Sequence, residues 1–116
     1  MTIRYKNQGF KQSGTTKTTV FTCPSDATCI VKSVYCANND ASSAIDVNAS
    51  LVDSSNSNTE YEFFRDNIAA KTQVNASPQG INLEAGDSIK VQAATGSNKI
   101  QGVISYAQID RSQENG

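Results

Sequence analysis

Apolar side chains recur at every second position in this chain, in short runs separated by turn residues. In IDVNASLV (45–52), positions 45, 47, 49 and 51 are apolar, and SIKVQA (88–93) alternates in the same way. A period of two predicts strands that bury one face. No stretch of ten or more residues has the spacing of an amphipathic helix. The pattern therefore predicts a chain built from strands.

Further runs rich in β-branched and aromatic residues predict additional strands. The run CIVKSVYCAN (29–38) is apolar on both parities, which predicts a central strand covered on both sides, with a bulge near Lys32 and Ser33. Residues 68–77 fit either a short strand or one helical turn. The remaining strands are expected over residues 16–22, 60–66, 81–83 and 99–110.

These segments give seven to eight strands with regular turn signals between them. This spacing predicts an all-β fold, an antiparallel β-sandwich of jelly-roll or immunoglobulin-like type without substantial helix. The sandwich domain is expected over residues 16–110. The polar segment 111–116 is expected to be a C-terminal tail.

The first fifteen residues are polar and show no alternation, so we expect a flexible N-terminal arm over residues 1–15. Tyr5 and Phe10 are isolated aromatics in this arm and are predicted to contact a neighbouring subunit. On this interpretation, removing the arm leaves the sandwich folded.

The stretch LEAGD (83–87) comes immediately before a strand and predicts a tight turn. Gly86 is expected to supply a positive φ, and Asp87 to accept backbone N–H groups. Glu84 and Asp87 offer a calcium site as an alternative. Because calcium takes six to eight oxygen ligands and only two carboxylates are identified, we predict no metal.

Composition narrows the classes of function. Ten basic and eleven acidic residues give a net charge of −1, which does not favour nucleic-acid binding. No apolar run is long enough to span a membrane, and the first residues do not resemble a secretory signal, so synthesis in a cytoplasm is expected. Two NAS triplets, at Asn48 and Asn75, are interpreted as chance matches to a glycosylation acceptor.

The three cysteines, at positions 23, 29 and 36, are interpreted as buried thiols, with a Cys23–Cys29 bridge across the intervening turn as the alternative. The chain has no histidine and no CxxC pair, so a zinc site is not expected. The carboxylates show no grouping across a cleft. We therefore expect no enzyme activity, no catalytic residue and no cofactor.

Four motifs in order resemble a family of small virion structural proteins of tailed bacteriophages, notably phages of marine bacteria and cyanobacteria. The matching elements are an aromatic-Thr-x-Pro turn at 21–24, a central strand at 30–38, the LEAGD turn, and a closing strand at 104–109. The resemblance covers about residues 16–110. Cys23 and Cys36 stand where the family has aliphatic residues, Gln108 stands where an acid is common, and the polar N-terminal segment is a further departure.

The resemblance implies a β-sandwich that decorates a virion and has no catalytic residue. The expected function is that of a capsid cement or decoration protein, which binds the outer capsid lattice and stabilises it. A tail, neck or fibre component with a host-surface role is the alternative, and a non-viral carbohydrate-binding or adhesin sandwich is a further one. The expected partners are the major capsid protein or other virion proteins, together with copies of the same chain, most simply as a trimer.

Overall fold

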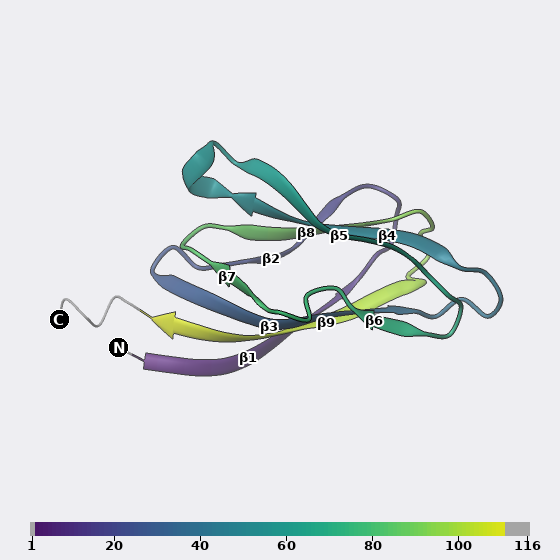
Figure 1. Ribbon diagram of the computed structural model, residues 1–116, viewed down its shortest axis with the longest axis horizontal. Helices are drawn as coiled ribbons and strands as arrows, with labels where there is room; N and C mark the ends of the chain where they lie inside the picture. The colour runs from purple at the N-terminus through teal and green to yellow at the C-terminus, as the bar shows by residue number, and fades with distance from the viewer. Residues whose placement is uncertain (1, 111–116) are drawn as a thin grey trace.

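The computed structural model describes residues 2–110, which form two antiparallel sheets packed face to face (Figure 1). This architecture is the β-sandwich that the alternation predicts. Within these residues the one helical segment is a 3₁₀ turn, η1 (Ser54–Asn56). The nine strands are β1 (Thr2–Lys11), β2 (Thr18–Thr22), β3 (Ala27–Asn38), β4 (Ile45–Asp53), β5 (Thr59–Ile68), β6 (Gln73–Asn75), β7 (Ile81–Leu83), β8 (Ser88–Ala93) and β9 (Ile100–Asp110).

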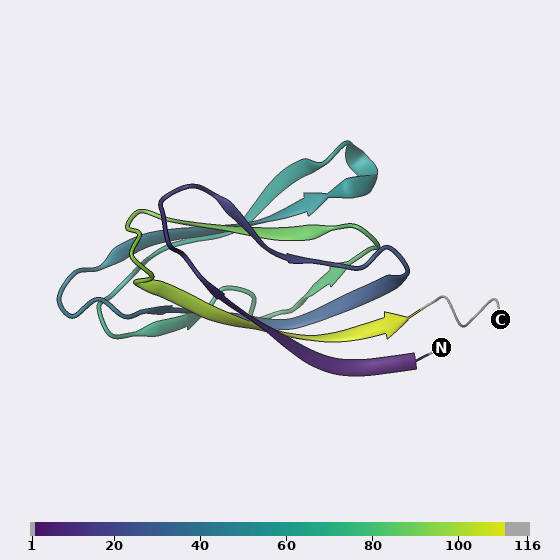
Figure 2. The ribbon, with the colours of Figure 1, turned by 180° about the vertical axis from the view of Figure 1, so that it is seen from behind.

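The five-stranded sheet has the order β1-β9-β3-β6, and β7 also pairs with β3. The four-stranded sheet has the order β2-β8-β4-β5. Figure 2 shows the two layers from behind, with β1 following the edge of the five-stranded layer. The predicted bulge in β3 is present as a register shift between Val31 and Ser33.

The core lies between the sheets and is filled by alternate residues of the central strands. On β3, Cys29, Val31 and Val34 are fully buried, and on β8, Ile89 and Val91 are fully buried. Leu51 pairs with Ile89 and packs against the same cluster, although it is only partly buried. In β4 and β8, the apolar positions of the alternating pattern thus face the core, as the sequence predicts.

The prediction of a flexible arm is wrong for residues 2–11. They form β1, whose ten residues pair in continuous register with β9, from Thr2–Asp110 to Lys11–Gln101. β1 is an edge strand exposed on both faces, so Arg4, Lys6 and Gln8 occupy core-side positions without burial. The alternation that would have identified the strand is therefore missing. Residues 111–116, predicted as a tail, lie outside the described part of the chain.

The three cysteines are buried thiols, and none forms a disulfide. Burial raises the pKa of the Cys36 thiol to about 12. Burial also raises the pKa of Cys29 to about 12, and a hydrogen bond with Cys23 adds to this effect. Cys23 and Cys29 thus lie together beneath the β2–β3 turn, and the raised pKa values keep the Cys29 and Cys36 thiols protonated at neutral pH.

Candidate functional site

One outer surface carries most of the exposed apolar side chains of residues 2–110. Six large apolar residues are exposed in this part of the chain, and five of them lie on the outer face of the β1-β9-β3 sheet. The sixth, Tyr61, is on the other sheet, where its hydroxyl accepts a hydrogen bond from Asn56 Nδ2 at 3.0 Å. The five are Ile3, Tyr5, Ile30, Tyr35 and Val103.

This surface corrects the sequence interpretation of β3. The strand is central in its sheet, but only the side bearing Val31 and Val34 is covered by the opposite sheet. On the other side Ile30 is 41% exposed and Tyr35 is 44% exposed. An apolar pattern on both parities thus marks a strand whose second face has no cover among residues 2–110.

The residues of this face separate into two groups. The first, which we call the β1 patch, occupies two adjacent rows of the sheet. Tyr5, Ala107 and Ile30 form one row, and Ile3 and Ile109 lie in the next. Tyr5 is 78% exposed, and Lys32 Nζ lies 5.5 Å from the centre of its ring. A partner that covered this patch would bury an aromatic ring already held by a cation–π contact.

The second group lines an open groove of about 490 Å³, which we call the Tyr35 groove. A polar row of Asn7, Ser105 and Ser33 separates it from the β1 patch. Phe10, predicted to be an exposed arm residue, instead packs partly against the core and lines this groove. The two predicted contact residues therefore lie on opposite faces of β1: Tyr5 points outward in the β1 patch, and Phe10 points toward the core.

The turn predicted from LEAGD has the expected geometry. Gly86 has a φ of 84°, and the Asp87 carboxylate accepts from Glu84 N at 2.9 Å and from Ser54 N at 3.0 Å. The Ser54 hydroxyl donates to the same carboxylate at 3.1 Å. Asp87 is 3% exposed, so these bonds satisfy a buried charge and tie the turn to η1.

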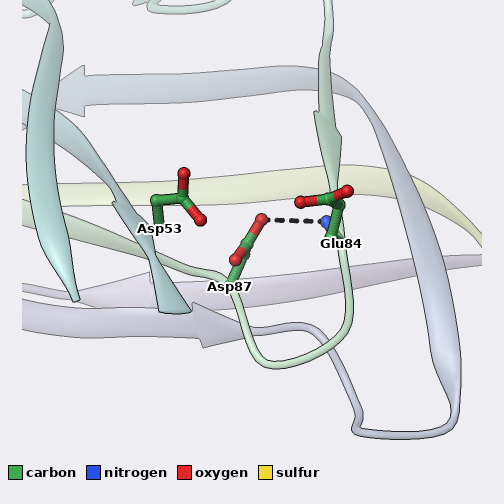
Figure 3. A group of neighbouring side chains, drawn as sticks. All are labelled: Asp53, Glu84 and Asp87. Carbon is green, nitrogen blue, oxygen red and sulfur yellow. Dashed lines mark hydrogen bonds between the residues drawn. The ribbon is translucent and has the colours of Figure 1, made fainter. Parts of the chain in front are cut away.

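Asp53 joins Glu84 and Asp87 in a group of carboxylates at this turn (Figure 3). One oxygen from each lies within 4.8 Å of the others. Sequence spacing did not associate Asp53 with the turn, because it comes from the end of β4. Three oxygens suit a hard cation, but Asp87 already accepts protein hydrogen bonds on both oxygens, and Asp53 accepts from Ser55 N and Oγ. Turn stabilisation accounts for the arrangement.

Comparison with known proteins gave no match, either among protein-family models or among curated proteins. Within residues 2–110 there is also no helix of the length and apolarity needed to cross a membrane. The functional argument therefore depends on the surfaces described above.

Proposed function

We propose that this protein is a structural component of a bacteriophage virion, most simply a capsid decoration protein that docks through its β1 patch. The proposal rests on one observation: the exposed apolar side chains are concentrated on one face of one sheet. A folded chain gains about 25 cal/mol for each Å² of apolar surface removed from water, so such a face favours a covering partner.

The opposite outer surface supports the same proposal, because two pairs of its charged side chains bond to each other within the chain. Lys17 Nζ lies 2.6 Å from Glu60 Oε1, and Arg65 makes two hydrogen bonds to Glu62 at 2.7 and 2.9 Å. A decoration protein needs one face that adheres and one that tolerates solvent and crowding. The net charge of −1 keeps repulsion between neighbouring copies low.

The partner proposed here is the major capsid protein, with an apolar, carboxylate-bearing surface. Apart from Lys11 and Lys32, the strands of this face carry no charged side chain on their outward positions among residues 2–110. Interfaces are enriched in aromatic residues and depleted in charge at their cores, which fits the exposed Tyr5 ring among the uncharged side chains of the patch.

The test is loading of purified full-length protein onto particles that lack it. The double variant Tyr5→Ser/Ile30→Ser is expected to reduce the bound protein at least about tenfold, because the two lost apolar contacts together are worth more than about 1.4 kcal/mol. Tyr61→Ser is the matched control, since it removes an exposed tyrosine from the other sheet and should load normally.

Equal loading of the double variant and the control would remove the β1 patch from the proposal. The copy number per particle separates the two virion locations, because a lattice protein is present at every capsid subunit position and a tail protein at few. Absence of loading by the unaltered protein onto any particle would end the virion proposal itself.

A further inference from the structure

The Tyr35 groove has a bare floor at Gly9, which occupies an outward position on β1 and has no side chain. Gly9 on β1 and Gly102 on β9 lie at adjacent register positions, since Gly9 pairs with Val103 and Phe10 with Gly102. A Cβ on Gly102 would collide with the Tyr35 carbonyl oxygen and with the Phe10 ring. Gly102 therefore allows the Phe10 ring to lie close against the backbone on the core side of the sheet, while the groove opens on the outer side over Gly9.

The walls of the groove combine one exposed aromatic ring with neutral amides. Tyr35 and Val103 are 44% and 43% exposed, and the amide side chains of Asn39, Gln73 and Gln101 also line the groove. Gln101 Nε2 donates to Asn98 O at 3.0 Å. Within residues 2–110, the side-chain amides of Asn39 and Gln73 make no hydrogen bond. The groove thus presents unused donors and acceptors beside an aromatic surface.

The charged and polar residues of the groove argue against phosphate-bearing ligands and against purely apolar ligands. Lys11 is the one charged residue that lines it within the described chain, and no carboxylate does. A phosphate or nucleotide requires several cations or a backbone N–H cradle. A purely apolar ligand would bury the amides without partners, at a cost of about 1–3 kcal/mol for each polar group.

We propose that the Tyr35 groove binds a neutral saccharide, with one hexopyranose ring against the Tyr35 side chain. A pyranose has an apolar C–H face that matches an aromatic ring and a rim of hydroxyls that matches the Gln73 and Asn39 amides. The volume lies within the range of about 300–1,000 Å³ that is usual for ligand sites. This inference is independent of the proposed docking, because the polar row of Asn7 and Ser105 separates the groove from the β1 patch.

The test is an NMR titration of the isotope-labelled full chain with methyl glycosides of glucose, galactose and mannose and with N-acetylglucosamine. At least one probe is expected to shift the backbone amides of Tyr35, Gln73 and Gly102 with a dissociation constant on the order of 1 mM, as suits a single ring in an open groove. Shifts confined to other surfaces, or no shift with any of the four probes, would overturn the proposal.

Three variants give the titration its specificity. Tyr35→Ala is expected to weaken binding about tenfold by removing the ring. Gly9→Val is expected to abolish binding by filling the groove, and it should fold because a Cβ there meets only Gly102 O, at 3.8 Å. Tyr61→Ala, the control, should bind normally. Unchanged affinity in a folded Gly9→Val protein would overturn the assignment even if a sugar binds elsewhere.

Discussion

The outer surfaces of the two sheets differ in how their side chains are satisfied. On the β2-β8-β4-β5 sheet, Lys17 pairs with Glu60 and Arg65 with Glu62, while Asn67 Nδ2 donates to Asp46 Oδ1 at 2.7 Å. On the β1-β9-β3 sheet the outward positions carry exposed rings and aliphatic groups in place of such pairs. On the β2-β8-β4-β5 sheet these polar side chains find partners within residues 2–110. On the β1-β9-β3 sheet the apolar side chains remain exposed to water.

The proposed docking and the proposed ligand binding both rest on this difference. Exposed Ile30 and Tyr35 contribute little to the core, because the side chains that fill it from the same strand are Val31 and Val34. An antiparallel sheet needs only one apolar face to fold. The second apolar face of β3 is therefore in excess of what the fold requires, and a bound partner or ligand is the physical reason that we assign to it.

The largest expected effect comes from removing the strand that forms the edge of the apolar surface. Deleting residues 1–15 is expected to unfold or aggregate the domain, because it removes the ten-residue β1 ladder and exposes the edge of β9. It also removes Gln12, which is 2% exposed and donates to Val91 O at 3.0 Å. The loss should be a large part of the about 5–15 kcal/mol typical of a domain.

Sedimentation and thermal unfolding of the truncated chain check this expectation. The full-length Tyr5→Ser variant is the control, since it keeps the strand and loses only an exposed ring. A truncated chain that stays monomeric with an unchanged melting temperature would restore the sequence-based interpretation of a dispensable arm.

The sequence predicts strands well where the opposite sheet covers them. In β4, Ile45, Val47 and Ala49 are buried as their alternation requires. β5 departs at a bulge, where the register shifts opposite Ala49 and Ser50 and both Phe63 and Phe64 pack against the core. Alternation alone could not predict this, because a bulge changes parity without changing composition.

The candidate sites were harder to predict than the fold. The sequence predicts Tyr5 as a contact residue, but within an arm, because an uncovered edge strand has no hydrophobic period. The groove joins Gly9, Tyr35 and Gln73 from three distant segments, and only the register brings them together. The available signal is the second set of apolar positions in residues 29–38, which by itself predicts burial rather than an exposed face.

A matched pair of substitutions sharpens the comparison between the two surfaces. Val52 is 8% exposed on the outer side of β4, and Val52→Thr should cost about 1–2 kcal/mol because it buries a hydroxyl. Ile30→Thr, on the apolar surface, should cost less than about 0.5 kcal/mol and should improve solubility. Urea unfolding measures both, and a larger loss for Ile30→Thr would mean that this surface supports the fold rather than a partner.

The smallest expected effect is a pH dependence that belongs to the polar surface. The hydrogen bond from Lys17 holds the pKa of Glu60 below its ordinary value, and the bond from Arg65 does the same for Glu62. A carboxyl whose folded pKa is lowered contributes stability above its unfolded pKa of about 4.3 and loses that contribution as the pH falls through the folded value. Both groups are exposed, so the loss should be slight.

Acid should therefore weaken the polar surface, while the apolar one, which carries no carboxylate at its outward strand positions within residues 2–110, keeps its binding properties down to the onset of unfolding. NMR titration of the side-chain carboxyl carbons should give midpoints for Glu60 and Glu62 below the ordinary value, and Glu60→Gln should remove part of the acid sensitivity of unfolding. Midpoints at or above the ordinary value would mean that the two ion pairs do not persist in solution. The two outer surfaces would then no longer differ in the pairing of their charges.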